Sequence, residues 1–374
     1  MSKVKFSDVV NNIKVNIDRE HNPYNHYIAG DHMDTEDIHL RRKGSFETDD
    51  VGPAFTRLFK IGQILYGSRR TYLKKAAIAD FEGITANTTF VFESRDESIF
   101  LTKLLPFLIQ SNSFTEWSVK KSKGSTNPYV VFSDLANFEF ELPELKIQKE
   151  YEDILWKIDN TREAYRNLIS SLDKLNKSRF IELFGDPRLN NKKLPIKKIK
   201  DFAKCIAGAT PSTAESSYWD NGTIPWMSSG EVNQGRIYST EKKITQKGYD
   251  NASTKLIPPH TVVIAMAGQG KTRGTVGVAE IELCTNQSIC SVVTDDTVDV
   301  DYLYYFLKLQ YEALRGASNG AAGRGGLNLK IIGDFPVIVP DLNLQKSFVK
   351  CVNQIDKSKL ILQKQLDDLV GETK

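Results

Sequence analysis

The sequence predicts a mixed α/β (α+β) protein with two tandem-duplicated α/β globular domains, separated by two long antiparallel coiled-coil helices. Three observations predict this fold. Short motifs repeat at a constant offset, each copy contains β-like runs followed by an amphipathic helix, and each copy closes with a long heptad pattern. A repeat of this size is far too long for a solenoid, so each copy is expected to be a complete domain with a connecting helix.

The duplication is visible as motifs that recur 197 residues apart, for example Phe138 with Phe335 and Asp159 with Asp356. The paired motifs are Leu142-Pro143 with Val339-Pro340, Leu145 with Leu342, Gln148-Lys149 with Gln345-Lys346, and Ile158 with Ile355. We therefore predict a first domain over residues 1–144, a central helix over 145–186, a second domain over 187–341 and a C-terminal helix over 342–374. Two similar surfaces on one chain would suit a long, repetitive partner.

Composition sets broad limits on the function. With 374 residues, 40% hydrophobic and 26% charged, the chain has room for two domain-sized cores. The net charge of +3 does not by itself require nucleic acid, although the basic residues are bunched in short runs. No signal-peptide pattern and no membrane-length apolar stretch are present, so we expect a cytoplasmic protein without a membrane partner.

Cysteine and histidine spacing gives no metal motif. The four cysteines lie far apart without CxxC spacing, which favours reduced thiols over a zinc site. His21, His26, His32 and His39 crowd the N-terminal stretch among acidic residues, but without the HExxH spacing of a helical metal site. We expect no metal centre.

Each copy opens with β-like runs and continues with an amphipathic helix. Runs rich in Val, Ile and Thr, separated by turn residues, predict strands. In the first copy they cover residues 61–66, 75–80 and 88–92, and in the second copy residues 223–227, 261–265 and 275–281. Leu, Phe and Tyr recur at three and four residues over 98–110 and 300–315, which predicts the helices.

The closing helices carry the clearest pattern. Apolar residues from Ile147 to Leu175 alternate at spacings of four and three, and the same register returns in the second copy. Gly185 and Pro187 end the first helix, which spans roughly 58 Å at about 1.5 Å per residue. Each helix could simply pack on its own domain. We prefer an antiparallel pair that acts as a spacer and subunit interface, formed by Tyr151, Ile154, Ile158, Tyr165, Leu168, Leu172, Phe348, Ile355, Leu362 and Leu369.

One motif resembles a nucleotide-binding loop. Residues 265–272 (AMAGQGKT) fit a relaxed Walker A pattern after a strand, but Arg273-Gly274-Thr275 leads into another strand rather than the helix that a P-loop requires. The segment is better interpreted as a β-hairpin tip that offers Gln269, Lys271 and Arg273 to phosphates or base edges. The first copy has an equivalent tip with Arg69, Arg70 and Tyr72. The alternative is that both tips are merely solvated turns.

Motifs for chemistry on DNA are incomplete. Asp134 and the Glu144-Leu145-Lys146 run loosely resemble a nuclease site, but the second copy has Ile331, Asp341 and Asn343 at the equivalent positions. Asn22-Pro23-Tyr24 is half of an amino-methyltransferase tetrapeptide, and no FxGxG cofactor loop accompanies it. We expect a protein without catalytic residues that binds no cofactor. A self-contained DNA methyltransferase or nuclease, and a coiled-coil scaffold that does not touch DNA, remain the alternatives.

A linked set of motifs resembles the specificity subunit of type I restriction-modification systems. In the second copy the set comprises Gly208-Ala209-Thr210-Pro211-Ser212, Tyr218-Trp219, Gly222-Thr223-Ile224-Pro225-Trp226, the 265–278 hairpin, Leu327-Asn328-Leu329-Lys330 and Phe335-Pro336-Val337-Ile338-Val339-Pro340, and Phe184-Gly185-Asp186-Pro187 follows the first helix. The resemblance covers nearly the whole chain. The first copy departs more, because it lacks the Gly-Ala-Thr-Pro opening and its hairpin is more basic.

The resemblance implies two target-recognition domains that each read one half of a split double-stranded DNA target. The helices would set the gap and dock methyltransferase (M) subunits, expected to number two, and restriction/translocase (R) subunits would join the larger complex. S-adenosylmethionine, ATP and Mg are then expected on the partner subunits. The candidate base contacts are the six tip residues named above, and the candidate phosphate contacts are Lys121, Lys123 and Arg324.

Overall fold

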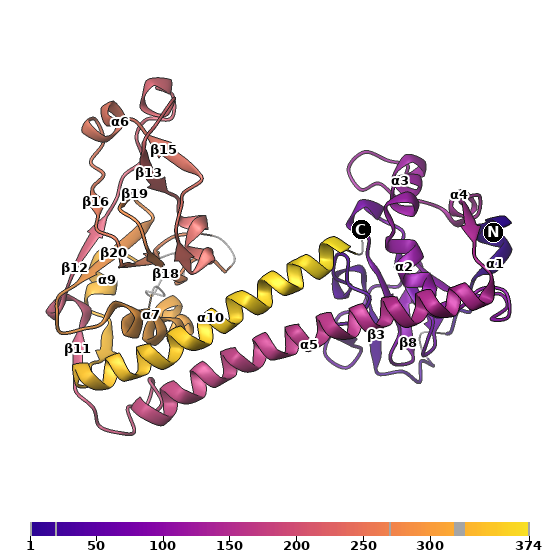
Figure 1. Ribbon diagram of the computed structural model, residues 1–374, viewed down its shortest axis with the longest axis horizontal. Helices are drawn as coiled ribbons and strands as arrows, with labels where there is room; N and C mark the ends of the chain where they lie inside the picture. Colours follow the sequence, from indigo (N-terminus) through magenta and orange to yellow (C-terminus); the bar gives the residue numbers. More distant parts are fainter. Residues whose placement is uncertain (1, 19–20, 269–270, 318–325, 373–374) are drawn as a thin grey trace. The chain divides into compact units, whose positions relative to one another are not determined.

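The computed structural model describes residues 2–18, 21–268, 271–317 and 326–372, and it divides into two compact units (Figure 1). The first unit comprises residues 1–166 and 365–374, and the second comprises residues 167–364. Each unit contains one α/β domain and parts of both long helices. No helix in the described ranges combines the length and the apolar character needed to span a membrane.

The first unit is built on two four-stranded sheets. One has the order β2-β9-β6-β7 and the other the order β4-β3-β8-β5, and a separate β1-β10 ribbon brings the start of the domain beside its end. The strands are β1 Ser2–Lys5, β2 Val10–Asn12, β3 His26–Ile28, β4 Gly44–Ser45, β5 Phe55–Phe59, β6 Ile64–Gly67, β7 Ala76–Ile78, β8 Gly83–Ala86, β9 Thr89–Ser94 and β10 Glu139–Leu142. The α-helices are α1 Phe6–Val9, α2 Leu105–Gln110, α3 Asn112–Lys121 and α4 Phe132–Leu135, with 3₁₀ turns at Gly30–His32, Thr71–Leu73 and Thr102–Leu104.

The second unit repeats this topology. Its larger sheet has the order β12-β20-β17-β18-β14, its second sheet the order β15-β13-β19-β16, and a β11-β21 ribbon corresponds to β1-β10. The strands are β11 Ile196–Lys198, β12 Ala203–Ala207, β13 Ile224–Met227, β14 Arg236–Ile237, β15 Lys242–Ile244, β16 Leu256–Ile257, β17 Thr261–Ala265, β18 Val276–Ala279, β19 Leu283–Thr285, β20 Ile289–Thr294 and β21 Pro336–Ile338. The α-helices are α6 Gln246–Asp250, α7 Val300–Leu309, α8 Tyr311–Gly316 and α9 Leu329–Gly333, with 3₁₀ turns at Ile199–Asp201, Ser216–Tyr218 and Ser229–Gln234.

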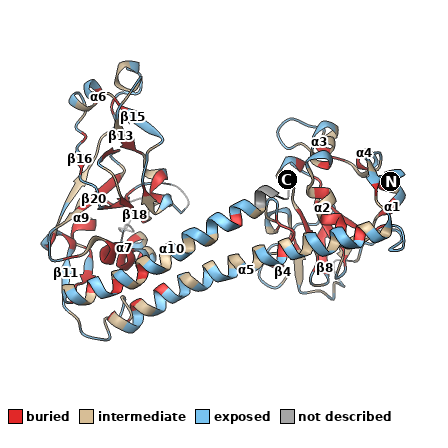
Figure 2. Ribbon diagram, viewed as in Figure 1, coloured by how far each residue is buried: buried red, intermediate tan, exposed pale blue. Residues whose placement is uncertain are grey.

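Aromatic side chains are abundant in both cores. Figure 2 marks the buried residues of each unit in red. In the first unit the Phe6 ring lies against Phe92 and Phe114, with centroids 5.5 and 5.2 Å apart. In the second unit Tyr302 and Phe348 are fully buried and belong to one continuous cluster. The predicted strands over 223–227 and 261–265 correspond to β13 and β17, so the fold class predicted from the sequence is confirmed.

Two predicted helices are shorter than their patterns. The 98–110 pattern becomes a 3₁₀ turn followed by α2, because Asp96 accepts hydrogen bonds from the Ser98 amide and hydroxyl and holds this segment in a turn. The 300–315 pattern is divided into α7 and α8 at Gln310. The buried Gln310 side chain donates to the Pro187 carbonyl oxygen, 2.6 Å away, which gives this position a role outside the helix.

The two long helices are α5 Leu145–Phe184 and α10 Leu342–Glu372. Gly185, with φ of 80°, ends α5 in the left-handed conformation that glycine adopts without strain. The two helices run antiparallel, because residues later in α5 contact residues earlier in α10. Arg162 donates to the Leu369 carbonyl in the first unit, and in the second unit Asp173 pairs with Lys359 and Asn176 with Asp356.

Candidate nucleic-acid interface

The first hairpin tip connects β6 to β7. Arg70 and Lys74 adopt positive φ values of 51° and 48° on either side of the 3₁₀ turn, a conformation that side chains other than glycine adopt rarely. The tip is anchored because the buried Ser68 hydroxyl donates to the Thr88 carbonyl (2.6 Å) and the Arg70 amide donates to the Pro128 carbonyl (2.7 Å). Arg69, Arg70 and Tyr72 are left exposed on a fixed backbone.

A strand-like segment around Tyr129 joins this tip to the predicted phosphate contacts. Tyr129 forms β-bridges with both Arg69 and Lys123, and its amide and carbonyl exchange hydrogen bonds of 2.9 and 2.8 Å with Lys123. The Lys123 ammonium lies 3.1 Å from the Asp134 carboxylate, and that of Lys121 lies 5.0 Å from the Trp117 ring centroid. The structure thus brings Arg69 and Lys123, which are far apart in sequence, to one surface.

A groove of about 430 Å³ lies beside the tip and contains residues that the sequence analysis missed. Arg69 and Tyr129 line it together with Lys14, Arg57 and Asn12. Both polar atoms of the Asn12 side chain are buried without a hydrogen-bond partner, which leaves a donor and an acceptor for a ligand. Burial lowers the pKa of Arg57, whose guanidinium donates to the Thr89 carbonyl at 2.9 Å. Only the pairing of distant strands gathers these residues, and we find no local sequence signal for them.

The second hairpin tip connects β17 to β18, and strand β18 follows it where a P-loop would have a helix. Gly274, with φ of 86°, turns the chain back, and its amide donates to the Ala265 carbonyl at 2.9 Å. The Tyr311 hydroxyl donates to the Lys271 carbonyl at 2.9 Å. Lys271 is exposed and Arg273 is half-buried. The predicted contacts Gln269 and Arg324 lie outside the described residues.

A second groove, of about 340 Å³, lies beside this tip. Lys271 lines it with Lys308, Asn233, Tyr304 and Tyr311, whereas Arg273 is not among its lining residues. The Lys308 ammonium lies 5.7 Å from the Tyr304 ring centroid, which orients this exposed cation beside an aromatic surface. Lys308 and Asn233 were not predicted, because both are ordinary polar residues on elements far from the tip in sequence.

The Gly-Ala-Thr-Pro opening of the second domain has a structural role. A Cβ atom at Gly208 would lie 1.7 Å from the Thr285 carbonyl oxygen, so only glycine fits there. The Trp226 indole donates to the Ala209 carbonyl at 3.0 Å, and the Thr210 hydroxyl donates to the Gln287 side chain at 2.6 Å. These contacts fix the end of β12 against the second sheet.

Matching glutamines attach each long helix to its domain. Buried Gln148 on α5 accepts from the Leu101 amide and donates to the Ile99 and Pro143 carbonyls, at 2.8 to 3.1 Å. Its counterpart Gln345 on α10 accepts from the Asp299 amide and donates to the Thr297 and Pro340 carbonyls, at 2.8 to 3.3 Å. The duplication therefore preserves the attachment of helix to domain as well as the motifs.

Ion pairs strengthen the attachment in the first unit. The His39 imidazole lies 2.7 Å from the Asp159 carboxylate on α5, and this hydrogen bond raises the pKa of His39. Arg41 donates two hydrogen bonds to Glu163 and two to Asp37, and the hydrogen bonding from Arg41 lowers the pKa of Glu163 to about 2. Arg41, from one of the basic runs, therefore binds a helix of its own unit.

The predicted helix-interface residues differ in exposure. Phe348 is fully buried, while Tyr151, Ile154 and Leu168 are between 46% and 54% exposed. The half-buried members are Ile158, Tyr165, Leu172, Ile355, Leu362 and Leu369. The fully covered positions on the described α5 include polar residues, among them Gln148, Asp159 and Asn176. Much of the apolar pattern therefore marks a face of α5 that its own unit leaves open.

The described residues contain no group of three His, Cys, Asp or Glu side chains placed to hold a metal ion. The four cysteines are free thiols. The acidic and histidine residues of the N-terminal stretch form hydrogen bonds instead, including those of Asp37 to Arg41 and His39 to Asp159.

Fold and site together define a class of tandem-domain proteins, in which each α/β domain presents a cationic β-hairpin and is followed by a long helix. The chain belongs to the type I restriction modification DNA specificity domain family, whose family model matches residues 18–174 and 191–370. The two matches coincide with the two copies found by internal comparison, and the resemblance inferred from the motifs is confirmed.

Three relatives are specificity subunits of type I restriction enzymes. That of HindI from Haemophilus influenzae is 20% identical over 376 residues, which cover 80% of this chain and 81% of the relative. That of EcoR124I/EcoR124II from Escherichia coli is 25% identical over 162 residues (43% of this chain, 40% of the relative). That of MjaIX from Methanocaldococcus jannaschii is 34% identical over 131 residues (34% and 29%). In the last two matches the chain spans less than half of the relative's length.

Solved structures show the same fold. The S subunit of a type I restriction-modification system from M. genitalium superposes with a TM-score of 0.60 and 15% identity, covering 100% of this chain and 93% of that chain. A structure that describes complex assembly and conformational transition of the type I R-M system gives a TM-score of 0.51 and 16% identity, with 100% and 94% covered.

Proposed function

We propose that this chain is the sequence-specific DNA-recognition subunit of a type I restriction-modification complex, and that each domain reads one half of a bipartite target. The observation that carries the proposal is the double match to the specificity-domain family, with one cationic hairpin and one adjoining groove in each copy. The segments would be a first recognition domain over residues 1–144, a spacer helix over 145–186, a second recognition domain over 187–341 and a second spacer helix over 342–374.

The hairpin tips supply suitable chemistry for DNA. A two-stranded ribbon fits the major groove, where each base pair presents a distinct pattern of donors and acceptors. In the first domain Arg69, Arg70 and Tyr72 would reach base edges, and the unsatisfied amide of Asn12 adds a group that matches adenine. In the second domain Lys271 and Arg273, together with Gln269, have this role.

Phosphate contacts would supply affinity that falls with salt, because Lys and Arg displace condensed counterions. Lys121 and Lys123 in the first domain and Arg324 in the second are the proposed contacts, and the grooves add Lys14 and Lys308. The tips carry different side chains, so the two halves of the target would differ in sequence.

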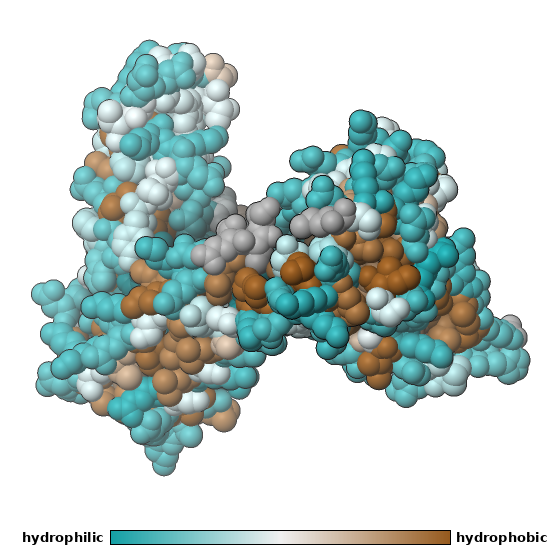
Figure 3. Space-filling model, turned by 45° about the vertical axis from the view of Figure 1, so that its right-hand side comes forward, coloured by the Kyte–Doolittle hydropathy of each residue, from teal (hydrophilic) through white to brown (hydrophobic). Residues whose placement is uncertain are grey.

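Chemistry would belong to the partners. We assign docking of two methyltransferase subunits to the open apolar face of α5, where Ile154, Leu168 and Leu175 share one heptad position and are 46% to 54% exposed. Figure 3 shows several hydrophobic patches in brown, separated by hydrophilic surface in teal. S-adenosylmethionine, ATP and Mg would bind to the methyltransferase and restriction subunits of this cytoplasmic complex.

Mapping of methylated adenines tests the proposal. Cells that carry the wild-type chain with its methyltransferase should methylate one bipartite sequence, and deletion of the gene should abolish that methylation. A Lys271→Ala/Arg273→Ala variant should change or lose the preference in one half of the target and leave the other half intact. As a control, Lys103→Ala changes an exposed cation that is paired with Glu152 on α5 and should leave the methylated sequence unchanged. Methylation unaffected by gene deletion would refute the proposal.

A further inference from the structure

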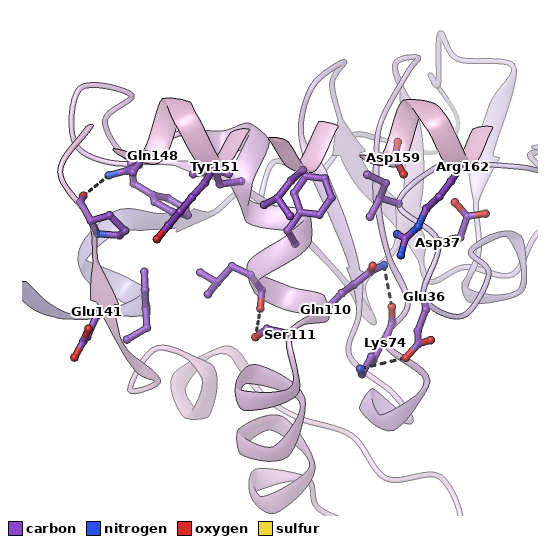
Figure 4. Close-up of a pocket in the computed structure, with 18 of the residues that line it drawn as sticks. Glu36, Asp37, Lys74, Gln110, Ser111, Glu141, Gln148, Tyr151, Asp159 and Arg162 are labelled. Atoms are coloured by element: carbon purple, nitrogen blue, oxygen red, sulfur yellow. Dashed lines mark hydrogen bonds and ion pairs between the residues drawn. The ribbon is translucent and has the colours of Figure 1, made fainter. Parts of the chain in front are cut away.

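Lys74 lies at the end of the first hairpin tip, but its side chain turns inward. Only 12% of the side chain is exposed, whereas Arg69 and Arg70 on the same tip are exposed. The Lys74 ammonium lies 3.2 Å from the Glu36 carboxylate and donates a hydrogen bond to the Asn112 side-chain oxygen at 3.0 Å. Figure 4 shows Lys74 and Glu36 facing each other beside a cavity of about 360 Å³. Lysine is seldom buried without a partner, so these contacts account for its inward position.

The backbone of Lys74 is in the left-handed region, and the second copy has a glycine at the equivalent position. The correspondence follows from a matching hydrogen bond of 3.0 Å, donated by the last residue of β6 or β17 and accepted by the carbonyl of Lys75 or Thr275. The residue before the acceptor is Lys74, with φ of 48°, in the first copy and Gly274, with φ of 86°, in the second. Glycine adopts this conformation without strain, whereas lysine does not.

Contacts on both sides of Lys74 hold this conformation. The Gln110 side chain on α2 donates to the Lys74 carbonyl at 3.3 Å and to the Ala76 carbonyl at 3.1 Å. Asn112, which accepts from the ammonium, is the first residue of α3. A strained backbone persists only where the surrounding structure fixes it. The Lys74 side chain therefore helps to fix the end of the tip.

A single 3₁₀ turn, Thr71–Leu73, connects Lys74 to Arg70. Two hydrogen bonds of 2.9 Å close it, one from the Lys74 amide to the Thr71 carbonyl and one from the last residue of the turn to the Arg70 carbonyl. Tyr72, in the middle of the turn, is 54% exposed. A change in the position of Lys74 would therefore move the backbone that carries Arg70 and Tyr72.

Glu36 belongs to the segment that attaches the first domain to α5. The neighbouring Asp37 carboxylate lies 3.6 Å from the Arg166 guanidinium on α5, and His39 pairs with the same helix. The carboxylate that holds Lys74 is therefore placed by a segment that is itself bonded to α5.

We propose that Lys74 is a positioning residue for recognition of the first half of the DNA target, and that it does not itself contact DNA. Through Glu36 and Asn112 it holds the tip, so that Arg70 and Tyr72 are presented in one geometry. This role rests on the proposed function, because it concerns the reading of one half-site. In the second copy, Gly274 meets the same backbone requirement without a side chain.

The test measures the affinity of the full chain, with its methyltransferase partner, for the target duplex and for duplexes with one half-site substituted. The half-site of the first domain is the one that Lys271→Ala/Arg273→Ala leaves unaffected. Lys74→Gly should reduce the preference for that half-site about tenfold, because glycine keeps the backbone conformation and removes only the anchor. The preference for the other half-site should stay the same. The slope of log affinity against log salt concentration should also stay the same, because no phosphate contact is lost.

Lys74→Met is a second variant and should show the same loss, and circular dichroism melting checks that all variants are folded. Glu36→Gln should cause a similar loss, and Lys74→Met/Glu36→Gln should lose little more than either single variant, because both changes remove one contact. Lys60→Met is the matched control, because Lys60 is an exposed lysine at the opposite end of β6 from the tip. It should leave both preferences unchanged.

Wild-type preference retained in Lys74→Gly would overturn this role alone. A uniform loss of affinity on all duplexes, with the salt slope reduced by about one, would make Lys74 a phosphate contact and would also overturn it. A wild-type chain without preference for either half-site would instead refute the proposed function, and the role of Lys74 with it.

Discussion

Replacing Phe180 by alanine should strongly destabilise the second unit. Phe180 is on α5, yet its ring is fully buried against Phe184, Tyr302, Phe306 and Phe348, with centroids 4.9 to 6.2 Å away. Removal of a buried phenylalanine costs about 3–5 kcal/mol, through the lost transfer free energy and the cavity that remains. Four surrounding rings limit how far this site can collapse, so we expect the upper half of that range.

The measurement is urea unfolding followed by tryptophan fluorescence, with hydrogen exchange used to assign each transition to a unit. With a slope of about 1–3 kcal/mol per molar urea, the midpoint for the second unit should fall by about 1 M or more. The neighbouring Ile181→Ala is the control, because Ile181 is 38% exposed and its loss should change the free energy of unfolding by about 0.5 kcal/mol or less. A loss below about 1 kcal/mol for Phe180→Ala would refute the view that α5 forms part of the second core.

Three further predictions concern DNA and pH. Lys308→Ala should weaken binding to all DNA duplexes uniformly and reduce the slope of log affinity against log salt concentration by about one, as measured by salt titration of a random duplex. A loss of affinity confined to one sequence would instead make Lys308 a base contact. The folded pKa of Glu163 is about 2, below its unfolded value near 4.5, so its pairing with Arg41 stabilises the first unit above pH 4.5 and is lost as the pH falls toward 2. Glu163→Gln should abolish this pH dependence in acid melting curves. An unchanged melting curve would contradict the prediction. Because the folded pKa of His39 is raised, its pairing with Asp159 stabilises the first unit fully below pH 6.5 and is lost as the pH rises through the raised value. His39→Gln should make the melting temperature independent of pH across this window. If the variant keeps the pH dependence, another titrating group causes it.

The tandem α/β fold class could be predicted from the sequence because motifs that hold each helix to its domain recur in both copies. The hairpin at residues 265–276 could also be predicted, since β-branched residues and glycine follow the Walker-like run where a helix would be required. The breaks at Gln310 and before α2 could not be predicted. The first break depends on the hydrogen bond that the Gln310 side chain donates to the distant Pro187 carbonyl, and the second on the hydrogen bonds that Ser98 donates to Asp96; apolar periodicity reports neither kind of polar contact.

The contacts of α5 were harder to predict, for a physical reason. Heptad analysis looks for apolar residues, but several of the contacts that attach α5 to its domain are polar, through Gln148, Asp159 and Glu163. A buried polar residue is stable only when each of its donors and acceptors is satisfied, so these positions demand particular partners in a particular geometry. The apolar stripe with Ile154 and Leu168 lies partly open instead. Sequence periodicity located the helix correctly, and burial was needed to show which face of α5 packs against the domains.

The attachment of each long helix to its domain responds differently to pH in the two copies. Asp159 and Asp356 occupy equivalent positions on α5 and α10, but Asp159 pairs with His39 and Asp356 accepts from the Tyr305 hydroxyl. Burial raises the pKa of Tyr305 well beyond the neutral range, so this bond keeps its proton at any physiological pH. The hydrogen bond to Asp159 raises the pKa of His39, and this pairing is lost as the pH rises through the raised value. Attachment of the helix to the domain is therefore sensitive to pH in the first unit and insensitive in the second. Since α5 begins in the first unit and ends in the core of the second, a rise in pH through the raised pKa of His39 should loosen only its first half.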